Sequence, residues 1–310
     1  ALERGIVYSK ILQEEPELEG GLYVLRDKRP HRLTYDPRDV EPAVARNGVI
    51  AFVRDGDLYL IRPDGTGLRQ LTAGPEIDER PLFSPDGRSL AFTRRAGPGA
   101  PRDIFLVRLD GAPPSALTSA PEDESSPAFS PDGGRIAFAR GVPLVVGGVA
   151  GDLYSVRTDG NGLRQLTRTR QREFGPRYFV GGIVFNRQGD GAPGIFTMRP
   201  NGSGVRAAFA PKRGATIAAV TLDGRRLAFR SGGDFWSKRL DRRAAPATWL
   251  MDSLGADELA VSPDGRRGAF LLYFDEQEAL AVIDLRRGGF VYTAEAYNLG
   301  EGGIDPRLAW

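Results

Sequence analysis

Short runs of alternating apolar and polar residues recur along the chain, and Asp-Gly, Asn-Gly or Pro-rich segments separate them. The runs are rich in β-branched and aromatic residues, and this alternation predicts strands with one buried face rather than helices. Residues 57–94 and 103–140 repeat nearly the same order of four runs, and a third copy begins at residue 152. Weaker copies begin near residues 21, 194, 234 and 280, so the pattern predicts an all-β chain of seven similar units.

One aromatic residue on the second run of each unit measures the length of the repeat. Four strands in about 44 residues is what one blade of a β-propeller requires. The sequence therefore predicts a single domain over residues 1–310, a seven-bladed β-propeller of four-stranded antiparallel blades. The aromatic positions, spaced by 40 to 47 residues, are Tyr8, Phe52, Phe92, Phe138, Phe185, Phe229 and Phe270.

The first run of each unit is expected to form the innermost strand, beside a central channel. These inner strands are predicted near residues 41–45, 80–84, 126–130, 175–179, 216–221, 257–262 and 304–310. The chain begins with a second-strand pattern at residues 4–10 and ends with a first-strand pattern, so its two ends complement each other. We expect the C-terminal strand to join the N-terminal blade and close the ring, which removes exposed sheet edges.

Residues 58–94, LYLIRPDGTGLRQLTAGPEIDERPLFSPDGRSLAFTR, and residues 153–167, LYSVRTDGNGLRQLT, resemble a known repeat. They are similar to the WD-like propeller repeats of periplasmic TolB proteins. They also resemble the propellers attached to prolyl-oligopeptidase-type and tricorn-type peptidases, without the catalytic domain of those enzymes. The resemblance implies a propeller that binds a protein or peptide in the cell envelope. The start at Ala1 is interpreted as a mature end left by signal-peptide removal, which implies a periplasmic or extracellular protein.

The connections between strands fall into two classes. Those from first to second and from third to fourth strand lie on one face, and they are short Asp-Gly or Asn-Gly turns such as residues 86–87 and 159–160. Turn chemistry explains these acids better than a calcium-binding array does. The other face carries the long, unequal loops at residues 10–21, 95–102, 141–151 and 273–279, and we expect a binding site there.

A carboxylate precedes the inner strand in most units. A ring of acids at the channel mouth could hold Ca²⁺ or Mg²⁺, or a basic peptide. Recurrence in unit after unit favours the interpretation that each acid bonds backbone N–H groups or an arginine of the neighbouring blade. Two acidic loops, near residues 14–19 and 275–278, fall on neighbouring blades and suggest a cationic partner. The acidic candidates for partner binding are Glu14, Glu15, Glu17, Glu19, Asp78, Glu79, Asp123, Glu124, Asp257, Glu258, Asp275, Glu276, Glu278 and Asp305.

Two further surfaces are candidates. The charge-free loop at residues 142–149 is either a partner contact or an added hairpin, and its candidate residues are Val142, Leu144, Val145 and Val146. Residues 152–243 hold 18 basic and 7 acidic residues, a net charge of +11 in a chain of net charge +2. This basic sector could bind an anionic partner, although no aromatic-interleaved groove favours nucleic acid. Its main members are Arg168, Arg170, Arg172, Arg225, Arg226, Arg239, Arg242 and Arg243.

Composition narrows the chemistry. The chain has no Cys and a single His, which excludes disulfides, thiol nucleophiles and sites with several histidine ligands. G-x-S-x-G, Walker and H-E-x-x-H motifs are absent from the sequence, as is any apolar run long enough to span a membrane. The favoured function is a non-catalytic protein-binding scaffold without a cofactor. The alternatives are a small-ligand or divalent-metal-dependent carbohydrate-active or hydrolytic enzyme with its site at the channel mouth, and a structural subunit of a larger extracytoplasmic assembly.

Overall fold

The structure, a computed structural model, shows regular secondary structure of one kind only in the part of the chain that it describes. All of that structure is β-strand, and every strand pairing is antiparallel. The prediction of an all-β chain is therefore confirmed. The described residues are 6–14, 17–26, 29–143, 149–189, 194–208, 215–221, 223–241, 247–252, 259–262, 266–274, 277–287, 290–293 and 308–309.

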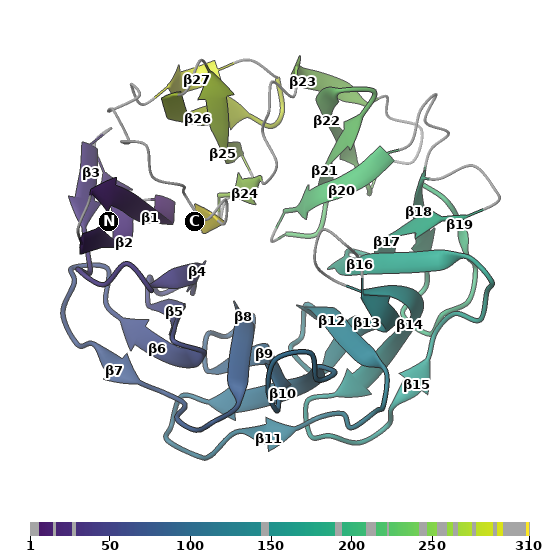
Figure 1. Ribbon diagram of the computed structural model, residues 1–310. Coiled ribbons are helices and arrows are strands. Elements are labelled where there is room, and N and C mark those ends of the chain that lie inside the picture. The colour runs from purple at the N-terminus through teal and green to yellow at the C-terminus, as the bar shows by residue number, and fades with distance from the viewer. Residues whose placement is uncertain are drawn as a thin grey trace.

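The strands are grouped into sheet units that follow one another around a common centre (Figure 1). The first unit contains β4 (Val40–Val44), β5 (Ile50–Arg54), β6 (Asp57–Ile61) and β7 (Arg69–Gln70). The second contains β8 (Ile77–Phe83), β9 (Ser89–Arg95), β10 (Asp103–Arg108) and β11 (Ser115–Ala116). The third contains β12 (Asp123–Phe129), β13 (Arg135–Pro143), β14 (Val149–Arg157) and β15 (Arg164–Gln165).

The second half of the chain continues this pattern. The fourth unit contains β16 (Arg172–Phe179), β17 (Gly182–Gln188), β18 (Gly194–Met198) and β19 (Arg206–Ala207). The fifth contains β20 (Ala215–Val220), β21 (Arg226–Ser231), β22 (Asp234–Arg239) and β23 (Thr248–Asp252). The sixth contains β24 (Ala260–Val261), β25 (Arg267–Phe274), β26 (Gln277–Asp284) and β27 (Phe290–Thr293).

The last sheet combines the two ends of the chain. Its order is β28 (Leu308–Ala309), β1 (Ile6–Glu14), β2 (Glu17–Arg26) and β3 (Arg29–Arg32). The register pairs Val7 with Ala309 and Tyr8 with Leu308, as the complementary end patterns predict. The third and fourth units merge into one larger sheet, because β14 also pairs with β16 at Gly151 and Glu173.

The inner strands of the second, third and fourth units begin earlier than predicted, which corrects the placement of their acids. Asp78, Glu124 and Glu173 lie within β8, β12 and β16 rather than in the loops before them. A bulge interrupts each pairing with the second strand, and a residue with positive φ occupies it, for example Arg80 at 59°. The bulge lets the strand continue, so the acids face the second strand instead of the open channel mouth.

The aromatic ruler residues form the core between units. Phe52, Phe92, Phe138 and Phe185 are fully buried, and each ring lies beside an aromatic ring of the third strand of its own unit. The ring centroids of Phe52 and Tyr59, for instance, are 5.6 Å apart. Phe92 packs with Ala51, Val53 and Leu58 of the first unit, so neighbouring sheets share one core.

The short connections have the expected turn chemistry. Oδ1 of Asp86 accepts hydrogen bonds from the Ser84 hydroxyl at 2.6 Å and from the Arg88 N–H at 3.0 Å. Asp132 and Asp223 make the equivalent contacts in two other units. The interpretation of these acids as turn residues is therefore confirmed for these three turns.

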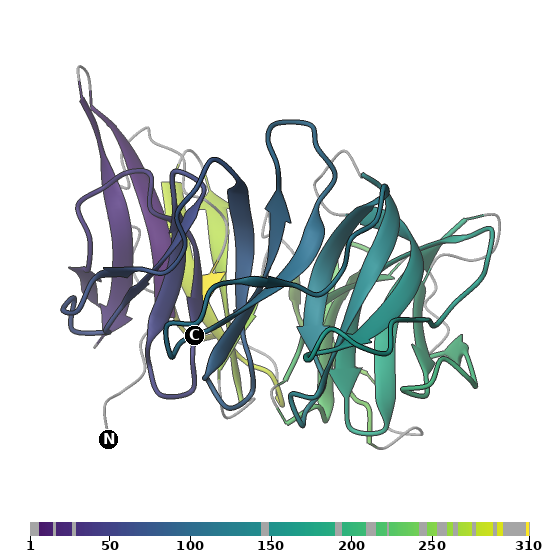
Figure 2. The same cartoon turned by 90° about the horizontal axis from the view of Figure 1, so that it is seen from below.

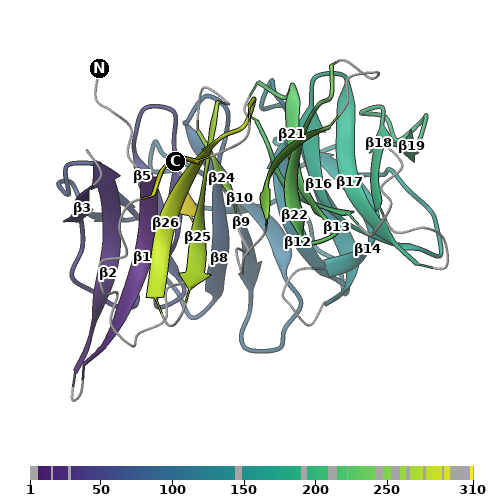
Figure 3. The ribbon, with the colours of Figure 1, turned by 90° about the horizontal axis from the view of Figure 1, so that it is seen from above.

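The opposite face carries the long second-to-third connections. Strands β1 and β2 pair from Ile6 and Leu25 out to Glu14 and Glu17, and their hairpin extends beyond the rest of the molecule (Figures 2 and 3). Strands β13 and β14 are extended in the same way, and their pairing reaches Pro143 and Val149. The two faces therefore differ in relief, one bearing tight turns and the other projecting hairpins.

Candidate functional site

A buried acid and an arginine face each other across the inner two strands of the second unit. Asp78 on β8 is opposite Arg94 on β9 in the register, and Nε and Nη2 of Arg94 donate to its two carboxylate oxygens at 2.6 and 2.8 Å. The Asp78 side chain is 1% exposed, so this carboxylate is held almost entirely by its arginine. The pair is bidentate, which is the strongest geometry for a carboxylate and a guanidinium.

A pair of acid and arginine recurs in the first, third and fourth units. It is again bidentate in the first unit, whereas Arg140 and Arg187 each contact a single oxygen of their glutamate. In each unit, the guanidinium also lies over the aromatic rings of the second and third strands, at 5.4 and 4.9 Å for Arg94. These arginines were missed from the sequence, although each follows the ruler phenylalanine by two residues. The four pairs are Asp39 with Arg54, Asp78 with Arg94, Glu124 with Arg140, and Glu173 with Arg187.

These contacts correct the predicted partner of the recurrent acids, which was an arginine of the neighbouring unit. Each of the four acids is bound by an arginine of its own unit, and in the second, third and fourth units the register of the two inner strands places acid and arginine opposite each other. A contact between units, of the predicted kind, is made by Asp123, which accepts from the backbone N–H of Arg102 at 2.7 Å and from its guanidinium at 2.9 Å. Arg102 also binds Glu79, so this arginine links the second and third units.

Burial raises the pKa of the two longer acids of these pairs. Desolvation raises the pKa of Glu124 and of Glu173, despite the opposing effect of hydrogen bonds from Arg140 and Arg187. The hydroxyl of Thr118, which belongs to the preceding unit, also donates to the carboxyl group of Glu124. Glu124 therefore links its own sheet to the preceding one.

Four described carboxylates of the predicted acidic mouth are consequently not open to a cation. Asp78, Glu79, Asp123 and Glu124 each have an arginine within 3.0 Å, and a positive neighbour opposes Ca²⁺ or Mg²⁺. Within the described ranges, no three His, Asp or Glu side chains come together as a metal site.

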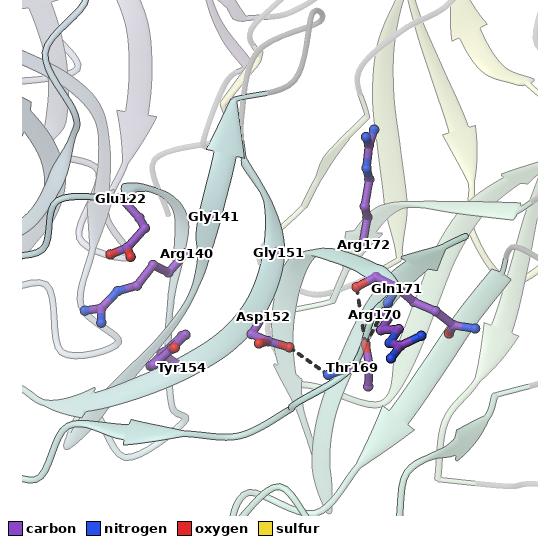
Figure 4. Close-up of a pocket in the computed structure, with 10 residues that line it drawn as sticks. All are labelled: Glu122, Arg140, Gly141, Gly151, Asp152, Tyr154, Thr169, Arg170, Gln171 and Arg172. Carbon is purple, nitrogen blue, oxygen red and sulfur yellow. Dashed lines mark hydrogen bonds between the residues drawn. The ribbon is translucent and has the colours of Figure 1, made fainter. Parts of the chain in front are cut away.

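A pocket of about 390 Å³ opens between the third and fourth units on the long-loop face (Figure 4). Glu122 and Arg140 lie on one side, and the segment from Thr169 to Arg172 lies on the other (Figure 4). Asp152 lies between them and is already bonded, because it accepts from the amide of Gln165 at 2.9 Å and from the Thr169 N–H at 3.1 Å.

The walls of this pocket are polar and carry charges of both signs. Arg170 and Arg172 are exposed members of the predicted basic sector, and they face a wall that contains Glu122. The floor is backbone, since Gly141 and Gly151 pair directly. A Cβ on Gly151 would come within 2.1 Å of the Arg140 carbonyl oxygen, so the close approach of β13 and β14 requires glycine there. The walls of the pocket can form hydrogen bonds and ion pairs with a ligand. Among the lining residues, however, no nucleophile is in contact with a general base.

The acidic hairpins project from this same face. The structure places the backbone of Glu14, Glu17 and Glu19 at the outer end of the β1–β2 hairpin, and that of Glu278 near the end of the β25–β26 hairpin. These hairpins belong to sheets that follow each other around the centre, as predicted (Figure 1). The remaining acidic candidates, Glu15, Asp257, Glu258, Asp275, Glu276 and Asp305, lie outside the described residues.

The other predicted surfaces are altered by the fold. Val142 is 57% exposed on the extended strand β13, in agreement with an added hairpin, whereas Leu144, Val145 and Val146 lie outside the described residues. The basic sector is not one surface. Arg168, Arg170 and Arg172 lie between a fourth and a first strand, while Arg225, Arg226 and Arg239 lie at the opposite ends of the strands. Arg242 and Arg243 are outside the described residues.

Comparison with known proteins supports the repeat and the fold. A TolB homolog from Chlorobium luteolum is 39% identical over 72 residues, which is 22% of this chain and 16% of that protein. This chain therefore covers less than a fifth of that relative. No protein-family model matches the chain.

Solved structures resemble the whole chain at low sequence identity. TolB from Acinetobacter baumannii is 14% identical, with 98% of this chain and 82% of that chain covered and a TM-score of 0.59. An oligogalacturonate lyase in complex with manganese is 12% identical, with 90% of each chain covered and a TM-score of 0.68. A puromycin hydrolase is 15% identical, with 89% of this chain and 52% of that chain covered and a TM-score of 0.67. The fold of the chain thus resembles that of a TolB propeller, and these neighbours include both a TolB protein and enzymes.

Proposed function

We propose that residues 1–310 form a single seven-bladed propeller, closed by the C-terminal strand, that acts as a non-catalytic protein-binding scaffold in the cell envelope. The succession of four-stranded units and the pairing of β28 with β1 support this architecture. The TolB-like repeat supports a periplasmic or extracellular location. Among the described residues there is no helix of the length and apolarity needed to cross a bilayer.

The observation that carries the proposal is the contrast between two sets of acids. The inner acids are buried and bound to arginine, so their charge is not available to a partner. The backbone of Glu14, Glu17, Glu19 and Glu278 lies in the β1–β2 and β25–β26 hairpins, which project on the long-loop face. Like charges concentrated on two adjacent hairpins attract a basic or N-terminal segment of a partner protein.

The proposal is tested by removing charge from one face at a time. The purified chain is immobilised and exposed to an envelope extract of its native source, and retained proteins are identified by mass spectrometry. Binding of the retained partner is then measured for the variant Glu14→Gln with Glu17→Gln, and for charge reversal of Glu14, Glu15, Asp275 and Glu276. We expect weaker binding, by tenfold or more for the reversal, and a smaller dependence on salt.

The matched control is Asp64→Asn with Asp159→Asn. It removes the same two charges from the opposite face, where each Asp holds a turn through its Oδ1, which Asn retains. We expect this control to bind as the wild type does. Unchanged affinity of the hairpin variants, or an equal loss in the control, would show that the long-loop face is not the docking surface.

An enzyme is the second candidate, because a manganese-bound lyase shares the fold over 90% of both chains. In this alternative, a divalent-metal-dependent carbohydrate-active site, or a hydrolytic one, occupies the channel mouth. Titration with Mn²⁺ and Ca²⁺ in a thermal melt tests it, together with release of unsaturated products from oligogalacturonate. A rise in melting temperature that disappears in Asp123→Asn would favour the enzyme.

A structural subunit of a larger extracytoplasmic assembly is the third candidate. It predicts a stable oligomer in size-exclusion chromatography, with the basic sector buried between subunits.

A further inference from the structure

Arginines gather on the short-turn face where the fifth and sixth units adjoin. In the fifth unit, Arg225 and Arg226 follow the turn after β20 and Arg239 ends β22. In the sixth, two arginines lead into β25 and two follow β26, which is the same end of an antiparallel meander. We call this group the basic turn cluster: Arg225, Arg226, Arg239, Arg266, Arg267, Arg286 and Arg287.

Hydrogen bonds between the two units make the cluster continuous. Nη1 of Arg226 donates to the Ser237 hydroxyl at 3.0 Å, and that hydroxyl donates to the Leu285 carbonyl oxygen of the sixth unit at 2.7 Å. The Leu285 N–H in turn donates to the Arg266 carbonyl at 2.8 Å. Arg226 is therefore positioned at the boundary, next to the segment that carries Arg286.

The carboxylates that the structure describes in these turns are bound within the turns themselves. Oδ1 of Asp223 accepts from the Thr221 hydroxyl and the Arg225 N–H, and Oδ1 of Asp284 accepts from the Arg286 N–H at 2.7 Å. Asp241 forms a bidentate pair with Arg239 at 2.9 and 2.6 Å. Among the described residues, no carboxylate forms an ion pair with Arg226.

The charge of Arg226 is consequently poorly compensated. Burial, followed by the neighbouring charges of Arg239 and Arg286, lowers the pKa of Arg226 below its ordinary value. By contrast, hydrogen bonds donated to Asp39 and Asp78 raise the pKa values of Arg54 and Arg94 in the inner pairs. An anion at the boundary would supply a countercharge that no described carboxylate provides to Arg226 through an ion pair.

We propose that the basic turn cluster binds a tetrahedral oxyanion, a phosphate or sulfate ester, between Arg226 of the fifth unit and Arg286 of the sixth. A guanidinium offers a planar fork of donors, and one fork satisfies a planar carboxylate. Two arginines from different units need a ligand with three or more acceptor oxygens directed apart, which phosphate and sulfate supply. The site lies on the face opposite the acidic hairpins, so it is independent of the protein docking proposed above.

The experiment titrates pyrophosphate into the full chain by calorimetry and thermal melting, with sodium chloride at matched ionic strength as the reference. We expect pyrophosphate to raise the melting temperature where chloride does not. The variants Arg226→Gln and Arg286→Gln should each weaken pyrophosphate binding by tenfold or more. Arg286 is exposed, so its variant tests the site even where Arg226→Gln lowers stability.

Arg88→Gln is the matched control. Arg88 follows Asp86 by two residues in the second unit, as Arg225 follows Asp223 in the fifth, and it is exposed. We expect this variant to bind pyrophosphate within twofold of the wild type. Equal stabilisation by chloride and pyrophosphate, or an equal loss in Arg88→Gln, would overturn the proposal.

Vesicle sedimentation distinguishes the sources of the ester. The chain is mixed with vesicles of pure phosphatidylcholine, or of phosphatidylcholine with phosphatidylglycerol at a 7:3 ratio. Sedimentation with the anionic vesicles alone, lost in Arg286→Gln, would support the site with a lipid headgroup as its ligand. Pyrophosphate binding without sedimentation would support it with a soluble ester, and failure of both would refute it.

Discussion

The inner pair of the second unit provides a natural test of how buried charge stabilises this fold. In the fifth unit the same two register positions are occupied by Ala215 and Ser231, so acid and base are both absent. The perturbation copies that unit into the second one, as Asp78→Ala, Arg94→Ser and the double variant. If the acid and the arginine stabilise the fold only together, the losses of unfolding free energy in the two single variants should sum to more than the loss in the double variant.

The magnitudes follow from burial. Arg94→Ser leaves the carboxylate of Asp78 only 1% exposed and without its partner, which costs about 3–5 kcal/mol. Asp78→Ala leaves Arg94, whose side chain is 18% exposed and can reach water, so it costs about 2 kcal/mol. The double variant loses the stacking over Phe92 and Phe105 but leaves no unpaired charge, and it should cost about 2 kcal/mol.

The assay is a double-mutant cycle in urea, followed by circular dichroism. The loss of unfolding free energy in the double variant should be smaller than the sum of the two single losses by at least about 2 kcal/mol. The unfolding entropy is about 2.1 cal/mol/K for each of the 310 residues. A loss of about 4 kcal/mol in Arg94→Ser therefore corresponds to a fall in melting temperature of about 6 °C.

The exposed pair Arg108 and Asp110 serves as the control cycle, since both side chains are more than half exposed. It should show no measurable coupling. Additive losses in the Asp78 and Arg94 cycle, or equal coupling in the two cycles, would refute the claim that burial makes the inner pairs cooperative.

Four further outcomes follow from the structure. Because burial raises the pKa of Glu173 from 4.5, wild type should lose stability relative to Glu173→Gln as pH rises through and above 4.5. Because the Ser130 hydroxyl lowers the pKa of Asp132 from 3.8, wild type should gain stability relative to Asp132→Asn as pH rises toward 4. Both pH predictions are checked by urea titrations at several pH values, and the same pH dependence of unfolding free energy in wild type and variant would contradict them. Removing residues 304–310 leaves β1 without β28, so the melting temperature should fall and size-exclusion chromatography should show association through the open edge; a monomer of unchanged stability would contradict this. Gly151→Ala, with its Cβ 2.1 Å from a carbonyl oxygen, should lose about 2 kcal/mol or more in urea, whereas Gly97→Ala, which meets nothing within 4 Å, should not.

Much of the fold could be predicted from the sequence because its signals are local. Alternation of apolar and polar residues fixes which face of a strand is buried, and Asp-Gly pairs fix where tight turns form. The ruler residue Phe138, for example, is fully buried on the second strand of its unit, as its position in the repeat predicts. The matching end patterns predicted that the C-terminal strand joins the N-terminal blade, and β28 pairs with β1 at Leu308 and Tyr8.

The candidate site could be predicted only in part. The sequence identified Asp78 and Glu124 as recurrent acids, but it placed them in exposed loops and left their arginines unnamed. One signal was available, since Phe229 is followed two residues later by Ser231 in the same unit that has Ala215 in place of the acid. Acid and arginine are thus lost together, which is what a direct contact predicts.

The sequence by itself determined the strands, the turns, the repeat and the complementary ends, because each depends on residues close together in the chain. Only the tertiary structure decided which charges are neutralised. A bulge with Arg80 at positive φ shifts the register so that Asp78 faces Arg94, and the boundary between two sheets brings Arg226 beside Arg286. Charge pairing depends on distances between residues far apart in sequence, and a few ångströms separate a structural ion pair from a surface that is open to a ligand.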